Sequence, residues 1–192
     1  MFKRKKIARF EKVSYNEFKN KILDIYNNEF VGTRPKFIYE SNIHTDILSN
    51  IKKAYDYLIL PARQTAGSAG YDFVAPYDII LRYMDSIIIP TGIKVYMKNN
   101  WILKIYPRSS FGNNGLKIEN TVPIIDSDYY NNSKTEGNIM IKITNENKSR
   151  ELLYIKEGER FVQGIFVEYG LAEEETPKRK RIGGTGSTNK NI

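Results

Sequence analysis

The sequence predicts an all-β fold for most of this 192-residue chain. From residue 58 onward, short runs rich in Ile, Val, Tyr and Phe are separated by Pro, Gly, Asn and Asp, as in YDFVAP, SIIIPTGIKVYM, WILKIYP, NIMIKITN and ERFVQGIFVEY. Closely spaced strands with turn signals between them are typical of sandwiches, barrels and jelly rolls, and not of alternating βαβ units. The 41% hydrophobic content of a chain of this length predicts one substantial core.

A short helical extension is predicted ahead of the strands, over residues 1–57. Ser14 can cap a helix, Glu17 three positions later can close a capping box, and Val13 with Phe18 fits a hydrophobic staple. Apolar residues continue with helical spacing to about residue 28, and a weaker helical pattern covers about residues 45–57. We expect one or two helices here, and no residue of this extension has an evident chemical role.

The β-rich part, residues 58–171, is followed by a predicted flexible arm over residues 172–192. The arm is first acidic, then basic, then rich in Gly, Ser and Thr, so it has too little apolar surface to order itself by burial. A disordered terminus would explain this composition. Glycines beside cations could instead fold over a phosphate group, because backbone N–H groups can then approach it closely.

Composition and charge limit the compartment and the partners. The net charge is +8, with basic runs at residues 3–6 and 178–181, which suits nucleic acid or a small phosphorylated ligand but also a solvated tail. Cysteine is absent, which excludes disulfides and thiolate chemistry and fits a reducing compartment. No apolar run approaches the ~20 residues of a membrane span. We therefore expect a cytoplasmic protein without membrane contact, whereas a nucleic-acid or protein partner lacks further support.

Five short motifs combine residue types that bind phosphates or activate water. They are AGYD ending at Asp72, PRSS containing Arg108, NTVPIIDSDYY containing Asp126, ERFVQG containing Gln163, and the glycine-rich GGTGST at residues 183–188. Arginine matches the geometry of phosphate oxygens, and a carboxylate can hold an attacking water. Each motif taken singly could be an ordinary turn or a strand end.

In this order and spacing, the five motifs resemble those of the trimeric deoxyuridine triphosphatase (dUTPase) family, which hydrolyses dUTP to dUMP and pyrophosphate. The resemblance covers about residues 58–188. It implies a distorted jelly-roll β-barrel and a homotrimer in which three chains contribute to each site. It also implies Mg²⁺ bound mostly by the triphosphate and water, so that no cluster of metal ligands is needed in the sequence. The biological result would be to keep uracil out of DNA and to supply dUMP for dTMP synthesis.

The resemblance implies a role for each matched residue. Asp126 matches the general base that holds the attacking water, and Tyr129 matches the ring that lies against deoxyribose and excludes a 2′-hydroxyl. Asp72 matches the acid that orders the phosphates and contacts the metal through water. The other matches are Arg108, Ser109, Ser110 and Gln163 for the phosphates, Asn120 for the uracil edge, and Lys180, Arg181, Thr185, Gly186 and Ser187 in the arm.

The chain departs from the family pattern at several points. Pro123 stands where the family has glycine in the uracil-reading hairpin, which removes one backbone donor. The turn after Tyr130 is longer than in the family and is expected to form an exposed loop. Thr185 replaces a phenylalanine that stacks on uracil. Spacing puts Lys180 at the position of a phosphate-binding arginine, and since Arg181 follows it, either could meet the terminal phosphate.

Two alternative functions differ in class. The related dCTP deaminases need a catalytic glutamate on the strand after the third motif, where this sequence has Lys142 and no carboxylate, so deamination lacks its proton shuttle. A non-catalytic relative that senses nucleotides or binds a regulatory protein would fit the altered arm and the basic ends. Such a protein would have no chemical need for the complete set of water-activating acid, sugar-facing tyrosine and phosphate-binding pair.

Overall fold

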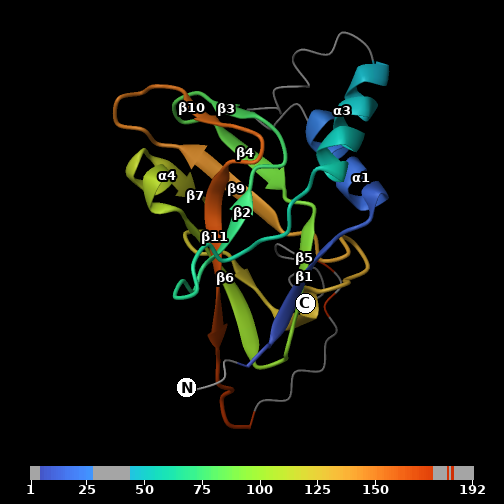
Figure 1. Cartoon of the computed structure of the whole chain (residues 1–192), viewed down its shortest axis with the longest axis vertical. Helices are drawn as coiled ribbons and strands as arrows, with labels where there is room; N and C mark the ends of the chain where they lie inside the picture. Colours follow the sequence, from blue (N-terminus) through green and yellow to red (C-terminus); the bar gives the residue numbers. More distant parts are fainter. Residues whose placement is uncertain (1–4, 28–43, 175–180, 182, 184–192) are drawn as a thin grey trace.

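The computed structural model describes residues 5–27, 44–174, 181 and 183, and within them the fold is mostly β-structure (Figure 1). Every paired strand runs antiparallel to its neighbour. The sheets have the strand orders β2-β11-β6-β8 and β4-β9-β7, with two further pairs, β1-β5 and β10-β3. The strands are β1 (Ala8–Lys12), β2 (Tyr71–Val74), β3 (Ile79–Leu81), β4 (Ser86–Pro90), β5 (Ile93–Met97), β6 (Trp101–Pro107), β7 (Leu116–Ile118), β8 (Ile124–Ile125), β9 (Met140–Asn145), β10 (Leu153–Ile155) and β11 (Arg160–Glu168). This jelly-roll-like arrangement confirms the predicted all-β fold.

Alternation of side chains along the strands builds one core. In β5, for example, Ile93, Val95 and Met97 are buried, whereas Lys94 is half-buried and Tyr96 is exposed. This is the period of two expected for a strand with one face against the core. The buried hydrophobic side chains of the sheets belong to a single cluster.

Two helices confirm the helical pattern in the N-terminal part of the sequence. They are α1 (Tyr15–Asn27) and α3 (His44–Asp56), which pack against each other at one corner of the molecule (Figure 1). Phe18 of α1 and Ile51 of α3 are fully buried, and both belong to the same cluster as the strands. The helices therefore extend the core of the β-structure instead of forming a core of their own.

Strand β1 was not predicted. It pairs with β5 from Ala8 opposite Met97 to Lys12 opposite Ile93, and Val13 N–H continues the pairing to Gly92 O at 2.9 Å. Its sequence, ARFEK, is short and charged, so its β-structure depends on the partner strand that supplies its hydrogen bonds.

The predicted capping box is half correct. The Ser14 hydroxyl accepts a hydrogen bond from Glu17 N–H at 3.1 Å, as expected for the residue that caps α1. Glu17 does not return the contact. Ser14 N–H instead donates to Glu136 Oε2 at 2.8 Å, so a carboxylate far away in the sequence completes the cap.

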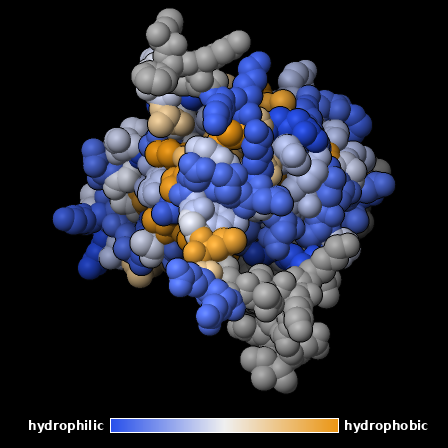
Figure 2. Space-filling model, turned by 90° about the horizontal axis from the view of Figure 1, so that it is seen from below, coloured by the Kyte–Doolittle hydropathy of each residue, from blue (hydrophilic) through white to orange (hydrophobic). Residues whose placement is uncertain are grey.

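The surface seen from the lower end of the molecule is mainly hydrophilic, with small hydrophobic groups among the polar ones (Figure 2). Among the described helices, none is both long and apolar enough to cross a membrane. Two short helical elements complete the fold, α4 (Ser109–Asn113) and the 3-10 turn η1 (Ser127–Tyr129), and both lie next to candidate site residues.

Candidate active site

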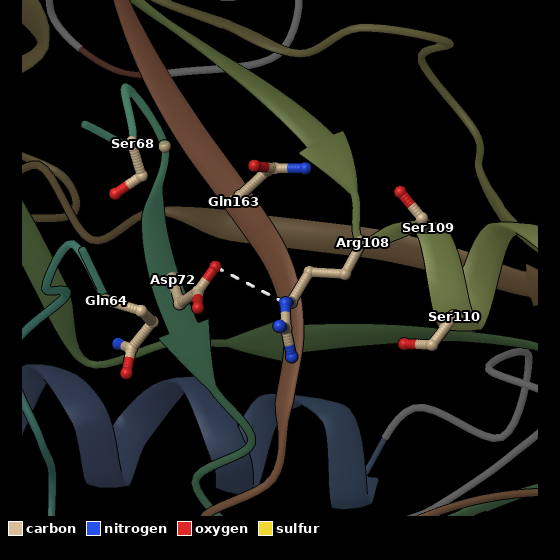
Figure 3. A pocket seen from close by; sticks show the side chains of 8 residues that line it. Gln64, Ser68, Asp72, Arg108, Ser109, Ser110 and Gln163 are labelled. Atoms are coloured by element: carbon tan, nitrogen blue, oxygen red, sulfur yellow. Dashed lines mark ion pairs between the residues drawn. The ribbon is translucent and has the colours of Figure 1, made fainter.

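Three neighbouring strands build a polar pocket. In the register of β11 with its two partners, Gln163 lies opposite Asp72 of β2 on one side and Tyr106 of β6 on the other. Arg108 follows the end of β6, and α4 begins directly after it. These positions enclose a pocket of about 360 Å³ that is lined by Gln64, Ser68, Gly70, Asp72, Arg108, Ser109, Ser110 and Gln163 (Figure 3).

Asp72 is a buried carboxylate with two arginine neighbours. Its side chain is 8% exposed, and its oxygens lie 3.4 Å from Arg108 Nε and 3.9 Å from Arg160 Nη1. The Arg108 side chain extends toward Asp72 across the pocket (Figure 3), and its Nη1 also donates to Arg160 O at 3.3 Å. The carboxylate thus orients a guanidinium whose remaining N–H groups can bind anionic oxygens.

The sequence did not lead us to predict Arg160 as a site residue. It lies in the motif ERFVQG, three residues before Gln163, so its place in this motif could have indicated it. Strand geometry then brings Arg160 and Val74 opposite each other, next to Asp72.

The glycine in the first motif, Gly70, is explained by the close approach of the Gln163 side chain to its backbone. A Cβ added to Gly70 would lie 2.3 Å from Gln163 Oε1, much nearer than any real contact. Gln163 therefore keeps its place in the pocket only because residue 70 has no side chain.

A second concavity contains Asp126. It has a volume of about 560 Å³ and is lined by Asn99, Ile102, Ile124, Asp126, Ser127, Asp128, Tyr169 and Arg181. Arg181 Nη2 pairs with Asp126 Oδ2, and Arg181 Nε lies 2.7 Å from Asp128 Oδ1. Burial raises the pKa of Asp126, although Arg181 opposes the shift. A carboxylate with a raised pKa is a stronger base when it is ionised.

Tyr129 lies at the end of η1 and is only 9% exposed. Its hydroxyl donates to Asn138 O at 2.9 Å, and burial raises its pKa. The phenol is therefore neutral, and its ring is held in one position.

The turn predicted to contact the uracil edge of the substrate lies between β7 and β8. Asn120 is exposed in it, and Thr121 has the positive φ of 59° that the turn requires. Pro123 is compatible with this turn because its carbonyl accepts a hydrogen bond from Ile105 N–H at 3.0 Å. The missing N–H of the proline leaves that sheet contact intact.

The structure thus gathers the predicted residues into two groups. Asp72, Arg108, Ser109, Ser110 and Gln163 line the first pocket, whereas Asp126 and Arg181 line the second, and the two share no lining residue. The remaining predicted arm residues, Lys180, Thr185, Gly186 and Ser187, lie outside the described residues.

The donor set of the first pocket can be tested against a magnesium ion. Over residues 5–27 and 44–174 with 181 and 183, no three His, Cys, Asp or Glu side chains cluster closely enough to enclose a metal. The pocket offers one carboxylate, hydroxyls and amides. Since Mg²⁺ keeps several waters and commonly binds substrate phosphates with one or two carboxylates, this set fits a metal held mainly by a triphosphate.

The family model described as dUTPase matches residues 56–189. A deoxyuridine 5′-triphosphate nucleotidohydrolase of Lactococcus lactis is 40% identical over 132 residues, which cover 67% of this chain and 87% of the relative. A second one, from Buchnera aphidicola of Schizaphis graminum, is 36% identical over 137 residues, covering 69% and 80%. The dUTPase structure from Streptococcus mutans superposes with a TM-score of 0.55 at 36% identity and covers 59% of this chain and 88% of that chain.

The arginine–acid pocket on an all-β fold and these matches define a nucleotide hydrolase, and the chain belongs to the dUTPase family. Its activity is that of a dUTP diphosphatase, the hydrolysis of dUTP to dUMP. Members of the family are typically trimeric and use a divalent metal. A dUTPase of phage phi11 of Staphylococcus aureus, similar in fold at 20% identity and a TM-score of 0.52, coordinates a structural Mg(II) ion.

Proposed function

We propose that Asp126 activates the water that attacks dUTP. We further propose that each active site forms in a homotrimer where the first pocket of one subunit meets the Asp126 hairpin of another. This hairpin comprises residues 119–129, from the turn after β7 to the end of η1. The observation that carries this proposal is the separation of the two groups of residues on one chain, which share no lining residue. A closed three-fold assembly would bring different surfaces of neighbouring subunits together at three equivalent places.

In the first pocket, the substrate would be held by its phosphates. The Arg108 fork can bind phosphate oxygens while Asp72 fixes its orientation from the other side, and the hydroxyls of Ser109 and Ser110 add donors. Mg²⁺, held by the triphosphate and water and reached by Asp72 through water, would neutralise the charge that develops on the leaving pyrophosphate. Gln163 would place its amide beside the same phosphates.

Asp126 would hold the attacking water in line with the bond to be broken and accept its proton. Burial, which raises its pKa, strengthens it as a base. Within one chain, Arg181 forms ion pairs with both Asp126 and Asp128. A bound triphosphate offers this guanidinium a competing anion, so substrate binding would release Asp126 for catalysis. Tyr129 would exclude ribose, and Asn120 would contact the uracil edge.

Subunit mixing tests the shared site. Asp126→Asn retains the first pocket, and Arg108→Ala retains the Asp126 hairpin. Asp126→Asn alone should be nearly inactive, and Arg108→Ala alone should retain at most about a tenth of the wild-type kcat/KM. Unfolding and refolding the two together should restore activity to about a quarter of the sites, since a random mixture pairs the two intact halves at that frequency. Pyrophosphate release with dUTP is the readout. Mixed assemblies that stay as inactive as the separate variants would refute the shared site.

Substrate preference tests the activity itself. The wild-type protein with Mg²⁺ should release pyrophosphate from dUTP in preference to dCTP, dTTP and UTP. Equal hydrolysis of all four would contradict the assigned roles of Asn120 and Tyr129. Release of ammonia from dCTP would instead favour the deaminase alternative.

A further inference from the structure

Tyr129 is followed by a loop, residues 130–138, that contacts strand β5 and also a part of the chain outside the family match. The match begins at residue 56. We propose that residues 9–17, here called the N-terminal segment, fix the position of Tyr129 and thereby set the preference for deoxyribose over ribose. This inference rests on the proposed contact between Tyr129 and the sugar.

The first attachment joins Ser14 to Glu136. The Glu136 carboxylate accepts hydrogen bonds from Ser14 N–H at 2.8 Å and from the Ser14 hydroxyl at 2.6 Å. Burial alone would raise the pKa of Glu136, but these two hydrogen bonds outweigh it, and the pKa is lowered. The ionised carboxylate lies at the N-terminus of α1, where the helix dipole favours negative charge.

The second attachment lies at the start of the loop. The Tyr130 hydroxyl donates to Glu11 Oε2 at 2.8 Å and holds the pKa of Glu11 below its ordinary value. Arg9 pairs with Glu11 and stacks 4.3 Å from the centroid of the Tyr96 ring, and that ring contacts Tyr130 edge to face at 5.7 Å. Strand β1 therefore holds one end of the loop, and the beginning of α1 holds the other.

Short contacts connect these attachments to Tyr129. The Tyr129 hydroxyl donates to Asn138 O at 2.9 Å and accepts from the Thr135 hydroxyl at 3.3 Å, while Asn132 Nδ2 donates to Tyr129 O at 2.8 Å. Gly137, with a φ of 86°, lies so close that an added Cβ would be 2.9 Å from Tyr129 O. Since Gly137 directly follows Glu136, displacement of Glu136 moves backbone that touches Tyr129.

The N-terminal segment is itself fixed by the helical pair. The Tyr55 hydroxyl of α3 donates to Val13 O at 2.8 Å, and Phe18 of α1 packs so closely on Gly92 that an added Cβ there would be 3.0 Å from the ring. Both Val13 and Phe18 are buried in the common core. In this proposal the two helices contribute to the reaction indirectly, because they hold the N-terminal segment whose Ser14 binds Glu136.

Selectivity is the property that should respond most to this support. A site that rejects an added hydroxyl by steric exclusion alone achieves discrimination of only about a hundredfold, and the rejection depends on how rigidly the wall is held. A displacement of about 1 Å in a reaction site can cost two orders of magnitude. A Tyr129 ring that can retreat would admit the 2′-hydroxyl of UTP while still accepting dUTP.

The experiment compares kcat/KM for dUTP and UTP in Ser14→Ala, Glu136→Gln and Tyr130→Phe. Glu146→Gln is the control for loss of a glutamate charge, because Glu146 is exposed and its carboxylate pairs with Lys117 at 2.8 Å instead of with the N-terminal segment. We expect the dUTP/UTP ratio to fall by about tenfold in Glu136→Gln, mainly through improved use of UTP, and by less in Tyr130→Phe. The control should keep the wild-type ratio.

Thermal unfolding of each variant separates positioning from general stability. A lower Tm with an unchanged dUTP/UTP ratio would overturn the inference, because it would show that the contacts only stabilise the fold. Tyr130→Phe removes a single hydroxyl and keeps the ring, so it answers the question even where Glu136→Gln does not fold. Failure of the wild-type protein to prefer dUTP would refute the proposed function, and the inference with it. A wild-type preference that all variants retain would refute the inference alone.

Discussion

The two halves of the proposed active site are built in different ways. The first pocket is formed by residues on β2 and β11 and at the end of β6, whose relative positions are set by backbone hydrogen bonds along the ladders. The Asp126 hairpin contains only the two-residue strand β8 and ends in the 3-10 turn η1, and a loop with positive φ at Asn131 and Glu136 continues from it. Backbone pairing of the strands fixes the pocket, whereas the hairpin depends, through the loop that follows it, on side-chain contacts with the N-terminal segment. The pocket should therefore respond mainly to substitutions at its own residues, whereas the hairpin should respond both to substitutions at its own residues and to substitutions elsewhere.

The largest effect is expected in the hairpin, from replacing the proposed general base Asp126. Asp126→Asn keeps the shape of the side chain but cannot accept a proton, so kcat for dUTP should fall by about a thousandfold, within the range for loss of a general base. Nucleotide affinity, measured by calorimetry, should stay within a few-fold of wild type because the first pocket is intact. In the wild type, kcat/KM should decrease as the pH falls through the pKa of Asp126, which burial raises above its ordinary value of about 3.9. Near-normal turnover of the variant would exclude Asp126 as the base.

In the first pocket, Arg108→Ala should weaken phosphate binding. A hydrogen bond to a charged group contributes about 1.5–3 kcal/mol, so kcat/KM should fall between about tenfold and a hundredfold, and the change also leaves the buried Asp72 without its nearest cation. Arg108→Lys is the informative control, because lysine restores the charge but not the planar fork. Full recovery with lysine would show that charge alone, and not the fork geometry, acts at this position.

The same contrast explains which parts of the two halves could be predicted from the sequence and which could not. Asp72, Arg108 and Gln163 were predicted from short motifs, and they meet because strand pairing brings motif positions together. The attachment of Glu136 to Ser14 joins residues 122 positions apart, and nothing in either local sequence indicates it. The capping box failed at Glu17 for this reason, since a tertiary partner took the place of a local one. Strand β1 was missed because its pairing with β5, not its own composition, makes it a strand.

Gly70→Ala should have an intermediate effect, and it tests how tightly the pocket is packed. The new methyl group would lie 2.3 Å from Gln163 Oε1, so the amide must turn away from its present position. We expect KM for dUTP to rise by a few-fold, because one phosphate contact is displaced while the arginine contact remains. The double variant Gly70→Ala with Gln163→Ala should then show little loss beyond that of Gln163→Ala, since the two changes act on the same amide. Additive losses would mean that Gly70 acts independently of Gln163.

The smallest effects should come from the helical pair, where support of the hairpin can be separated from surface charge. Tyr55→Phe removes the hydrogen bond to Val13 O from a part-buried site, which should lower the free energy of unfolding by about 0.5–1.5 kcal/mol. Lys52→Ala breaks the exposed ion pair with Asp56 on the same helix, which contributes about 0–0.5 kcal/mol. Chemical denaturation measures both, and dUTP turnover should change less than twofold in either.

The same two variants should differ in substrate selectivity. Since Val13 precedes Ser14, Tyr55→Phe should reduce the ratio of kcat/KM for dUTP to that for UTP slightly, whereas Lys52→Ala should not. An equal ratio in the two variants would mean that α3 supports the fold without reaching Tyr129.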